Sequence, residues 1–595
     1  MNRIASVAVA AILCWASAAT APAETPLPEG TSVLPADPLG AFVLLGQSAQ
    51  AGRMEKVPVE GQKFTQALRV RVTARPENPW FLQVHATTTA PVAKGDVLLA
   101  RFSIRCIESM TGEASVGFVF ELGKDPWTKS VEFSVSAGRT WTEVNVPFTS
   151  VGTYGPGEAG INFPVGFAVQ TVEIGGISVV NYAAKVKPKD LPRTGFSYGG
   201  REPEAPWRKE AAERIEKIRK GDLAVTVRDA AGKPLAGADV TVRMTRHAFG
   251  FGSAVAAQAL MADNEDARKY RDTVRRMFNK VVFENDLKWP GWEDRGRRAI
   301  LFQAADWLKE QGIAIRGHCL VWPSWRYTPK DLQGLKGDPE ALRKRVADHV
   351  REEAAAMKGR LVEWDVINEP FSNHDIQDVL GNEVMVEWFR IAHEADPQAE
   401  LYLNDYSILS GGGRDTAHQD HFEKTLRFLI EKGAPLGGIG MQGHFGWALT
   451  PPPKMLEILD RYAALGRPIQ VTEFDVDVSD EPLQAEFLRD FMTTLFSHPS
   501  VKGIVMWGFW EGLHWKPNAA LFRRDWSVKP NGQAWMDLVL KQWWTEVAGK
   551  TAADGRFATR GFLGDYEVTV TAGGKTNTVR AALPQAGATV AVTMD

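Results

Sequence analysis

Eight short apolar runs alternate with longer helix-like segments between residues 246 and 545. The strand-like runs lie near residues 248–254, 281–283, 314–316, 361–366, 400–403, 438–441, 469–472 and 503–507. Eight consecutive β/α units close a (β/α)8 barrel, in which functional side chains lie at the C-terminal ends of the strands. The sequence therefore predicts an α/β fold class with a (β/α)8 TIM barrel over residues 246–545.

Two of the predicted strands are followed by a glutamate. Glu369 comes after the run 361–368, and Glu473 comes after the run 469–472. Neither has a Lys or Arg beside it in the chain, although a buried carboxylate needs either a cation or access to solvent. Because one barrel brings its strand ends together, we expect two carboxyl groups at one mouth, which suggests glycoside chemistry.

Four other predicted strands end in polar side chains. These segments are Glu284-Asn285-Asp286-Leu287-Lys288-Trp289, Arg316-Gly317-His318-Cys319-Leu320-Val321-Trp322, Asn404-Asp405-Tyr406 and Gln442-Gly443-His444. Taken singly, each has an ordinary structural explanation: His318 or His444 could be a hydrogen-bonded core histidine, and Lys288 a solvated charge. Their placement on successive strands of one barrel favours a shared site.

Residues 246–545 resemble family 10 glycoside hydrolases, the xylanase-type barrels. The resemblance rests on Trp507, Trp515 and six motifs in family order: Glu-Asn-x-x-Lys-Trp, Gly-His-x-Leu-x-Trp, Asn-Glu-Pro, Asn-Asp-Tyr, Gln-x-His and Thr-Glu-Phe-Asp. It implies a retaining endo-1,4-β-xylanase that hydrolyses internal β-1,4-xylosidic bonds of xylan by double displacement.

The resemblance also implies roles for individual residues. Glu369 matches the acid/base and Glu473 the nucleophile. Asn368 matches the residue that bonds the sugar 2-hydroxyl, and His444 the one that orients the nucleophile. The substrate-contacting positions are Glu284, Asn285, Lys288, His318, Trp322, Gln442, Trp507 and Trp515, with Tyr406 on the leaving-group side. The acid needs a raised pKa in this mechanism, and His444 would help to keep Glu473 ionised.

One segment departs from the family pattern. After Trp322 the chain has Pro323-Ser324-Trp325, where many members have His and Gln. This change alters the hydrogen bonds expected on the glycone side and could add a stacking surface.

Other functions stay open at this point. Within enzymes, the alternative is another β-glycanase or a transglycosylase on the same barrel. From other classes, the alternatives are a non-catalytic polysaccharide-binding protein and a structural adhesion protein built from β modules. The presence of both Glu369 and Glu473 argues against a pure binder, which does not need both.

Amino-acid composition limits the classes of molecule that this protein is expected to bind. The chain has 69 basic and 72 acidic side chains and a formal net charge of −3, so no basic field indicates nucleic acid binding. No histidines show a ligand spacing such as His-x-x-x-His, and Asp475-x-Asp477 lacks the glycine and later glutamate of a calcium loop. We therefore expect xylan or a related plant cell-wall polysaccharide as the partner, with no metal and no cofactor.

Residues 1–23 have the parts of a secretory signal peptide. Arg3, an apolar run over residues 4–19 and Ala21-Pro22-Ala23 predict cleavage after Ala23 and a secreted or periplasmic location. No later apolar run reaches the ~18 residues of a membrane helix. Cys14 lies within the apolar run over residues 4–19. The remaining cysteines, Cys106 and Cys319, fall in different predicted domains, so we expect free buried thiols.

Residues 30–184 contain short alternating runs separated by Gly, Pro and Asp turns. This pattern predicts a jelly-roll-like β-sandwich. The region loosely resembles the carbohydrate-binding modules often joined to xylanases. Trp80, Trp127, Trp141 and Tyr154 are candidate sugar platforms, although core or rim packing is the more common role of such residues.

The segments that flank the barrel each have too few strands for a core of their own. Residues 222–245 predict a hairpin, and residues 546–595 predict further strands. Together they resemble one small β-sandwich of the carboxypeptidase-associated regulatory kind, split by the barrel. Residues 185–221 predict a linker and a docking helix whose apolar face carries Trp207, Ala211, Ile215 and Ile218.

Overall fold

The computed structural model describes residues 28–46, 51–109, 114–195, 197–446 and 448–594. The predicted signal peptide, residues 1–23, lies outside the described residues. The chain divides into two compact units, residues 1–195 and residues 196–595. In the described part of the chain, no helix is both long enough and apolar enough to cross a lipid bilayer.

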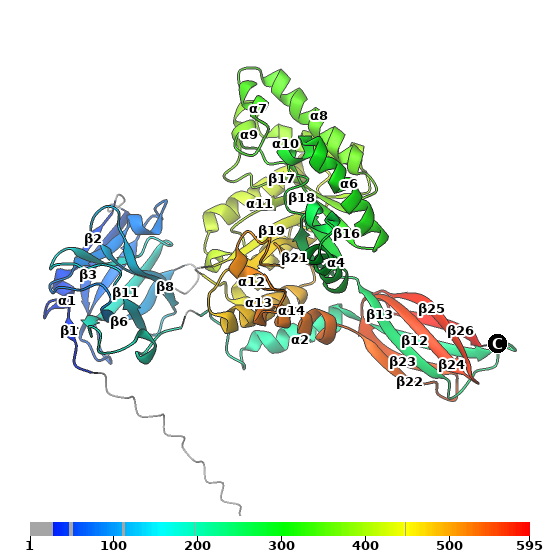
Figure 1. Cartoon of the computed structure of the whole chain (residues 1–595), viewed down its shortest axis with the longest axis horizontal. Helices are drawn as coiled ribbons and strands as arrows, with labels where there is room; N and C mark the ends of the chain where they lie inside the picture. Colours follow the sequence, from blue (N-terminus) through cyan, green and yellow to red (C-terminus); the bar gives the residue numbers. More distant parts are fainter. Residues whose placement is uncertain (1–27, 47–50, 110–113, 196, 447, 595) are drawn as a thin grey trace, which may run out of the picture. The chain divides into compact units, whose positions relative to one another are not determined.

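The first unit is a β-sandwich of two antiparallel sheets (Figure 1). One sheet has the strand order β3-β4-β11-β6-β9, with β1 also paired to β11, and the other has the order β2-β5-β10-β7-β8. The strands are β1 (Thr31–Ser32), β2 (Val43–Leu45), β3 (Gly52–Pro58), β4 (Gln66–Val72), β5 (Gln83–Thr87), β6 (Val97–Ser109), β7 (Ala114–Leu122), β8 (Lys129–Ala137), β9 (Thr142–Thr149), β10 (Ala159–Pro164) and β11 (Gln170–Asn181). Phe102, Phe118 and Phe163 meet in the core between the sheets.

The four aromatic residues singled out in this sandwich differ in exposure. Tyr154 is buried in edge contact with Phe120, and Trp141 is half-buried in edge contact with Phe64. Trp80 and Trp127 are 54% and 51% exposed. Of the four, Trp80 and Trp127 present most ring surface to solvent.

The second unit contains the predicted barrel. Its strands are β14 (Gly250–Val255), β15 (Lys280–Phe283), β16 (Ala314–Val321), β17 (Glu363–Asn368), β18 (Glu400–Asp405), β19 (Gly438–Phe445), β20 (Ile469–Val476) and β21 (Val501–Met506). They form a closed, all-parallel barrel, which confirms the predicted fold class. All residues of β17 and β20 are buried, because a barrel strand faces packed side chains inside and helices outside.

Helices connect the barrel strands, and one more follows the last strand. They are α3 (Ala257–Met261), α4 (Glu265–Met277), α5 (Trp289–Glu293), α6 (Arg295–Glu310), α7 (Lys330–Gly334), α8 (Pro339–Met357), α9 (Asp375–Leu380), α10 (Glu383–Ala395), α11 (Thr416–Glu431), α12 (Pro452–Ala463), α13 (Glu481–Phe496) and α14 (Pro530–Asp537). Five of the longer ones begin at capping side chains that accept a backbone N–H in the first turn, namely Asn264, Asp294, Asp338, Asp415 and Asp480. These caps fix where α4, α6, α8, α11 and α13 start.

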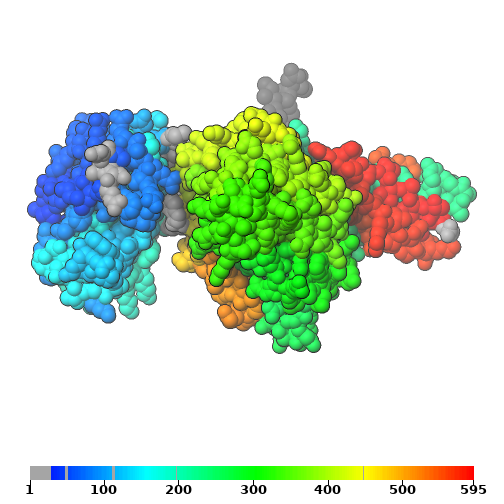
Figure 2. All heavy atoms as spheres, turned by 90° about the horizontal axis from the view of Figure 1, so that it is seen from above, coloured from blue at the N-terminus to red at the C-terminus, as the bar shows by residue number. Residues whose placement is uncertain are grey.

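Strands from both sides of the barrel segment pair with one another. β12 (Lys220–Asp229) lies between β23 (Arg556–Phe562) and β26 (Ala588–Met594), while β13 (Asp239–His247) lies between β22 (Glu546–Lys550) and β24 (Gly564–Ala572), followed by β25 (Lys575–Leu583). Figures 1 and 2 show the two segments side by side. The early hairpin therefore obtains the strands it lacks from the far end of the chain.

The helix α2 (Pro206–Ile218) precedes these strands and packs on the barrel. It buries Trp207, Ala211 and Ile215. Arg208 pairs with Asp490 of α13 at 2.6 Å. Arg219, at the end of α2, donates to the backbone carbonyls of residues 496, 498 and 501, where α13 passes into β21. The chain entering β12 is thus tied to the barrel.

The thiols of Cys106 and Cys319 are both buried and free, as expected.

Candidate active site

The two glutamates lie at the C-terminal ends of barrel strands. Glu369 directly follows β17, where its φ of 55° turns the chain out of the strand. Glu473 lies within β20 and is 4% exposed. A positive φ is uncommon outside glycine and clusters at functional sites. Both carboxyl groups therefore come from strands whose ends meet at one mouth of the barrel.

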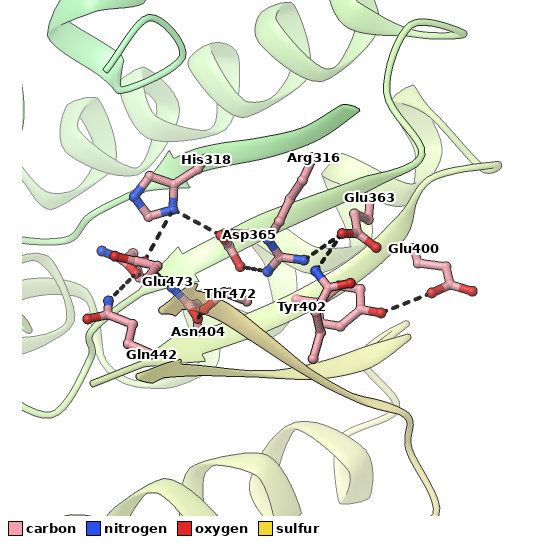
Figure 3. A network of polar contacts seen from close by, with 12 residues as sticks. Arg316, His318, Glu363, Asp365, Glu400, Tyr402, Asn404, Gln442, Thr472 and Glu473 are labelled. Carbon is pink, nitrogen blue, oxygen red and sulfur yellow. Dashed lines mark hydrogen bonds and ion pairs between the residues drawn. The ribbon is translucent and has the colours of Figure 1, made fainter. Parts of the chain in front are cut away.

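Three amide side chains join the two carboxyl groups. Asn404 donates to Glu473 at 2.8 Å and to Oδ1 of Asn368 at 2.9 Å. Gln442 donates to Glu369 at 2.8 Å and to the same oxygen of Asn368 at 3.5 Å. Figure 3 shows Asn404, Gln442 and Glu473 close together. One continuous set of hydrogen bonds therefore runs from Glu369 to Glu473.

The surroundings of Glu369 favour its protonated form. Burial raises the pKa of Glu369 to about 7, and the negative charges of Glu473 and Asp405 act in the same direction. The hydrogen bond from Gln442 opposes this shift. Below about pH 7, Glu369 is a carboxylic acid that can give up a proton.

The surroundings of Glu473 favour its ionised form. Burial alone would raise the pKa of Glu473, but His318 and the contact with Nε2 of His444 at 3.2 Å lower it from 4.5. Burial also disfavours a charge on His444, yet Asp475, 2.8 Å from Nδ1, and Glu473 raise the pKa of His444 to about 9. His444 is therefore a cation between two carboxylates near neutral pH, and it keeps Glu473 ionised.

A buried ionic network joins β15, β16 and β17 beside the site (Figure 3). Arg316 pairs with Asp365 and, at 3.1 Å, with Glu363, and Lys280 pairs with Glu363 at 2.9 Å. Despite burial, Lys280 and Arg316 lower the pKa of Glu363 to about 2. Asp365 in turn lies 2.9 Å from Nδ1 of His318. The network thus fixes the ring that faces Glu473.

One flank of the site is formed after β15 and β16. Lys288 donates to Asn285 at 3.0 Å and lies 5.3 Å from the ring centroid of Trp322. Burial raises the pKa of Glu284, and Lys288 opposes the shift. The Trp322 ring stacks on Tyr327 with centroids 3.7 Å apart. Tyr327 covers one face of Trp322, which therefore offers less stacking surface than a free indole ring.

Another flank of the site is formed after β21. Trp507 is buried and meets the ring of His318 edge-on at 5.1 Å. Trp515 is 51% exposed, and its indole nitrogen donates to Asp475 at 2.8 Å. Its ring also meets His444 edge-on at 4.9 Å. Trp507 also meets the ring of His444, at 6.3 Å, so both tryptophans lie near the cation beside Glu473.

The segment that departs from the family pattern is anchored by Asp375. This carboxylate accepts from the Ser324 hydroxyl at 3.0 Å and from the Trp325 backbone N–H at 2.9 Å. The Trp325 side chain packs against the main apolar core. Because the ring of Trp325 is partly used in packing, it is not a fully free stacking surface.

Four residues in contact with the site were missed as site residues at the level of sequence: Asn404, Asp365, Asp475 and His418. Asn404 and Asp475 stand in the Asn-Asp-Tyr and Thr-Glu-Phe-Asp motifs, which could have identified them. Asp365, like Glu363 two residues earlier, is a charge within an apolar run, which is a weaker signal. His418, on α11, has no motif around it that would have indicated its contact with Asp405.

Across the residues that the structure describes, no group of three or more His, Cys, Asp or Glu side chains is arranged to hold a metal ion. The charged groups of the site instead pair with one another, as in the contacts of His444 with Glu473 and Asp475. At the strand ends, the shifted pKa values give one protonated and one ionised carboxyl group at mildly acidic pH.

Comparisons with known proteins place this barrel in a family. The family profile described as Glycosyl hydrolase family 10 matches residues 242–538. A beta-1,4-xylanase from Dictyoglomus thermophilum is 31% identical over 282 residues, which cover 41% of this chain and 75% of that protein. This chain belongs to glycosyl hydrolase family 10. The range matched to family 10 contains every site residue described above, from Glu284 to Trp515.

Other relatives of this family 10 chain are longer proteins. Anti-sigma-I factor RsgI6 of Acetivibrio thermocellus is 34% identical over 391 residues, 65% of this chain and 48% of that protein. Endo-1,4-beta-xylanase 1 of Arabidopsis thaliana is 33% identical over 361 residues, 60% of this chain and 37% of that protein. The chain thus spans less than half the length of either relative. Among solved structures, xylanase 10B from Thermotoga petrophila RKU-1 in complex with xylobiose is 29% identical, with a TM-score of 0.45 and coverage of 50% of this chain and 95% of that one.

Proposed function

We propose that this family 10 chain is a retaining endo-1,4-β-xylanase that hydrolyses internal β-1,4-xylosidic bonds of xylan. The observation that carries the proposal is the opposite shift of two carboxyl pKa values. That of Glu369 is raised to about 7, and that of Glu473 is lowered from 4.5. Double displacement requires one protonated and one ionised carboxyl group on either side of the scissile bond.

In the first step, Glu369 gives its proton to the glycosidic oxygen while a carboxylate oxygen of Glu473 attacks the anomeric carbon. The bond to the leaving sugar breaks, the sugar departs as an alcohol, and a glycosyl ester forms on Glu473. The contact of cationic His444 with Glu473 supports this role, because it favours the ionised nucleophile before attack.

In the second step, Glu369 works as a base. Ester formation removes the negative charge of Glu473, which is one of the charges that raise the pKa of Glu369. The pKa of Glu369 therefore falls, and the ionised group takes a proton from the water that attacks the anomeric carbon. Glu473 leaves as a carboxylate, Glu369 is protonated again, and the product keeps its configuration.

We assign binding of the sugar 2-hydroxyl to Asn368. Both neighbouring amides donate to its Oδ1, and its buried Nδ2 has no hydrogen-bond partner among the described residues. A hydrogen bond from Nδ2 that strengthens as the ring gains positive charge would lower the barrier. The other proposed sugar-contacting residues are Glu284, Asn285, Lys288, His318, Trp322, Tyr406, Gln442, Trp507 and Trp515.

The test is product analysis on unsubstituted xylan, glucuronoxylan, arabinoxylan and β-glucan, with the anomer followed by NMR at early times. Short β-xylo-oligosaccharides of retained configuration are expected. The names of the Dictyoglomus and Arabidopsis relatives support xylan as the substrate. Release from β-glucan alone, or elongated oligosaccharides, would instead assign another β-glycanase or a transglycosylase.

A second candidate function is polysaccharide recognition without hydrolysis. The relative that aligns over 65% of this chain is named an anti-sigma-I factor rather than a xylanase. If this candidate is right, the unmodified protein should bind xylo-oligosaccharides in calorimetry and release no product during long incubation. Hydrolysis that disappears in Glu473→Gln, while oligosaccharide binding remains, would exclude it.

We propose further that the N-terminal sandwich, residues 30–184, binds polysaccharide. The exposure of Trp80 and Trp127 supports this proposal, because indole rings stack on the apolar faces of sugars. The test is retention of the full-length Glu473→Gln variant on insoluble xylan. Adding Trp80→Ala or Trp127→Ala should weaken retention, whereas Tyr154→Phe, at a buried ring, serves as the control.

The remaining proposals concern the limits of the parts. We propose a catalytic barrel over residues 246–545, a split β-sandwich from residues 222–245 and 546–595, and a linker and helix over residues 185–221. The strand pairing between the two flanking segments supports the split sandwich. Export through residues 1–23 predicts that protein recovered from the periplasm or medium begins at Glu24.

A further inference from the structure

His418 is a buried titratable side chain that the double displacement does not use. It lies in the first turn of α11 and is 0% exposed. Its Nε2 lies 3.0 Å from Oδ1 of Asp405, the last residue of β18. Asp405 is also 0% exposed, and its Oδ2 has no hydrogen-bond partner among the described residues. A carboxylate buried this deeply depends strongly on the few donors it has.

His418 also contacts the loop that carries Glu369. Its ring stacks on Phe371 with centroids 3.9 Å apart and an angle of 17° between the rings. It meets the ring of Tyr406 edge-on at 4.5 Å. Asn373, in the same loop, donates to the Glu369 carboxyl group at 3.3 Å. One imidazole therefore joins Asp405, the acid/base loop and the aromatic residue assigned to the leaving-group side.

We propose that His418 is a positioning residue for the acid/base, acting through Asp405. With its Nε2 3.0 Å from Oδ1, His418 stabilises the negative charge of Asp405, and this charge favours the protonated form of Glu369. Its ring also holds Phe371 and Tyr406 in place around the leaving group. The inference deepens the proposed hydrolysis and rests on it.

The charges around the pair support this direction. Burial raises the pKa of Asp405, whereas the bond from His418 and the backbone N–H of Tyr406, at 2.9 Å, oppose the shift. The charge of Asp405 adds to burial in raising the pKa of Glu369. The other titratable groups that face Glu369, Asp405 or their neighbours on α11 are His318, Glu473, His374, His421 and Lys424.

Replacing His418 by Phe should keep a ring against Phe371 and remove the donor. Burial then raises the pKa of Asp405 further, so Asp405 takes up a proton and loses its charge. Without that charge, Glu369 loses its proton at a lower pH. Since the first step needs protonated Glu369, the alkaline limb of kcat/KM on xylan should move to lower pH.

The experiment measures kcat/KM against pH on xylan for the full chain and its variants. His418→Phe should lower the alkaline limb by about half a pH unit, a roughly threefold loss of rate above it. His418→Gln keeps an amide donor, and its limb should stay near that of the parent. His421→Phe is the graded comparison: His421 is on the same helix and also meets Phe371 edge-on, at 5.2 Å, but it lowers the pKa of Asp405 less than His418 does, so its limb should move less.

Two further comparisons separate positioning from packing. On an aryl xylobioside with a dinitrophenol leaving group, which needs no proton, His418→Phe should keep the bond-cleavage rate of the parent. Asp405→Asn should shift the alkaline limb in the same direction, and adding His418→Phe to it should produce no further shift. This non-additivity is the signature of two residues that act through one charge.

An unshifted limb in a folded His418→Phe variant, or an equal rate loss with both leaving groups, would reduce His418 to a packing residue. If that variant does not fold, Asp405→Asn and His418→Gln make the same comparison, and an unshifted limb in Asp405→Asn overturns the inference. If the parent protein releases nothing from xylan, it is the proposed function that fails, so the two failures are distinguishable.

Discussion

Glu369 and Glu473 carry the same functional group, and their surroundings make them chemically different. The Glu369 carboxyl group accepts hydrogen bonds from the neutral amides of Gln442 and Asn373. Glu473 accepts from a neutral amide as well, but it also faces cationic His444. In a buried site a cation stabilises the ionised form more than an amide does, which separates acid from nucleophile.

The first prediction concerns pH. Because Glu369 must hold a proton and its pKa is raised to about 7, kcat/KM on xylan should fall as pH rises through about 7. Because the pKa of Glu473 is lowered from 4.5, activity should persist into mildly acidic solution. A pH series measures both limbs. The residual activity of Glu369→Gln on xylan should lack the alkaline limb of the parent, and a limb that survives in this variant would contradict the assignment.

The second prediction separates the two roles. Glu369→Ala and Glu473→Ala should each lose about 10²-fold or more of the turnover on xylan while keeping the parent circular dichroism spectrum. Azide can occupy the space of the missing carboxylate. With an activated substrate, the Glu369 variant should give the azide product of retained configuration and the Glu473 variant the inverted one. NMR identifies the anomer of each azide product. An inverted product from the Glu369 variant and a retained one from the Glu473 variant would exchange the acid/base and nucleophile assignments.

The third prediction links His444 to stability. Its pKa is raised from 6.5 to about 9 in the folded protein, so folding is coupled to proton binding. The resulting stability is fully present below about pH 6.5 and is lost as pH rises through about 9. Between about pH 6.5 and 9, urea unfolding should show a smaller fall in the free energy of unfolding for His444→Gln than for the parent. The exposed His374 provides the control, since His374→Gln should leave the slope unchanged.

At the scale of elements, the barrel strands were predictable because both of their faces are buried. Each strand is therefore a short apolar run, and each observed strand begins within two residues of its predicted start. The polar contacts among strands were not predictable. Arg316 ends one predicted run and Glu363 lies inside another, and only the closed barrel brings them together. Likewise, the stacking of Trp322 on Tyr327 depends on a loop conformation that no periodicity encodes.

The fourth prediction concerns the junction between α2 and the barrel. Arg219 is 7% exposed and donates to three backbone carbonyls at the end of α13 and the start of β21. Arg219→Met should lower the free energy of unfolding by about 2 kcal/mol or more, because buried carbonyls lose their donor. Arg214→Met is the control. Arg214 pairs with Glu210 on the same helix near the surface, so the expected loss of unfolding free energy is below about 1 kcal/mol. Urea unfolding measures both losses. Equal losses would show that the bonds of Arg219 to the buried carbonyls do not stabilise the junction more than a surface pair does.

At the scale of the whole molecule, each compact unit has its own apolar core. Every residue assigned to the catalytic site lies between Glu284 and Trp515, inside the second unit. The described part of the first unit contributes exposed Trp80 and Trp127, whereas the side chains joined to the two glutamates belong to the second unit. Hydrolysis and polysaccharide retention are therefore separable in principle.

The fifth prediction tests this separation. A chain of residues 197–595 should fold and should cleave soluble xylo-oligosaccharides with kcat/KM within about twofold of the full chain, because the site keeps all its contacts. On insoluble xylan the shortened chain should be slower, since it lacks the exposed rings of Trp80 and Trp127. Full-length Trp80→Ala combined with Trp127→Ala should reproduce that loss on the solid substrate alone. If the shortened chain instead loses activity on soluble oligosaccharides while remaining folded, the first unit contributes to the site itself, and the assignment of all catalytic contacts to the barrel would have to be revised.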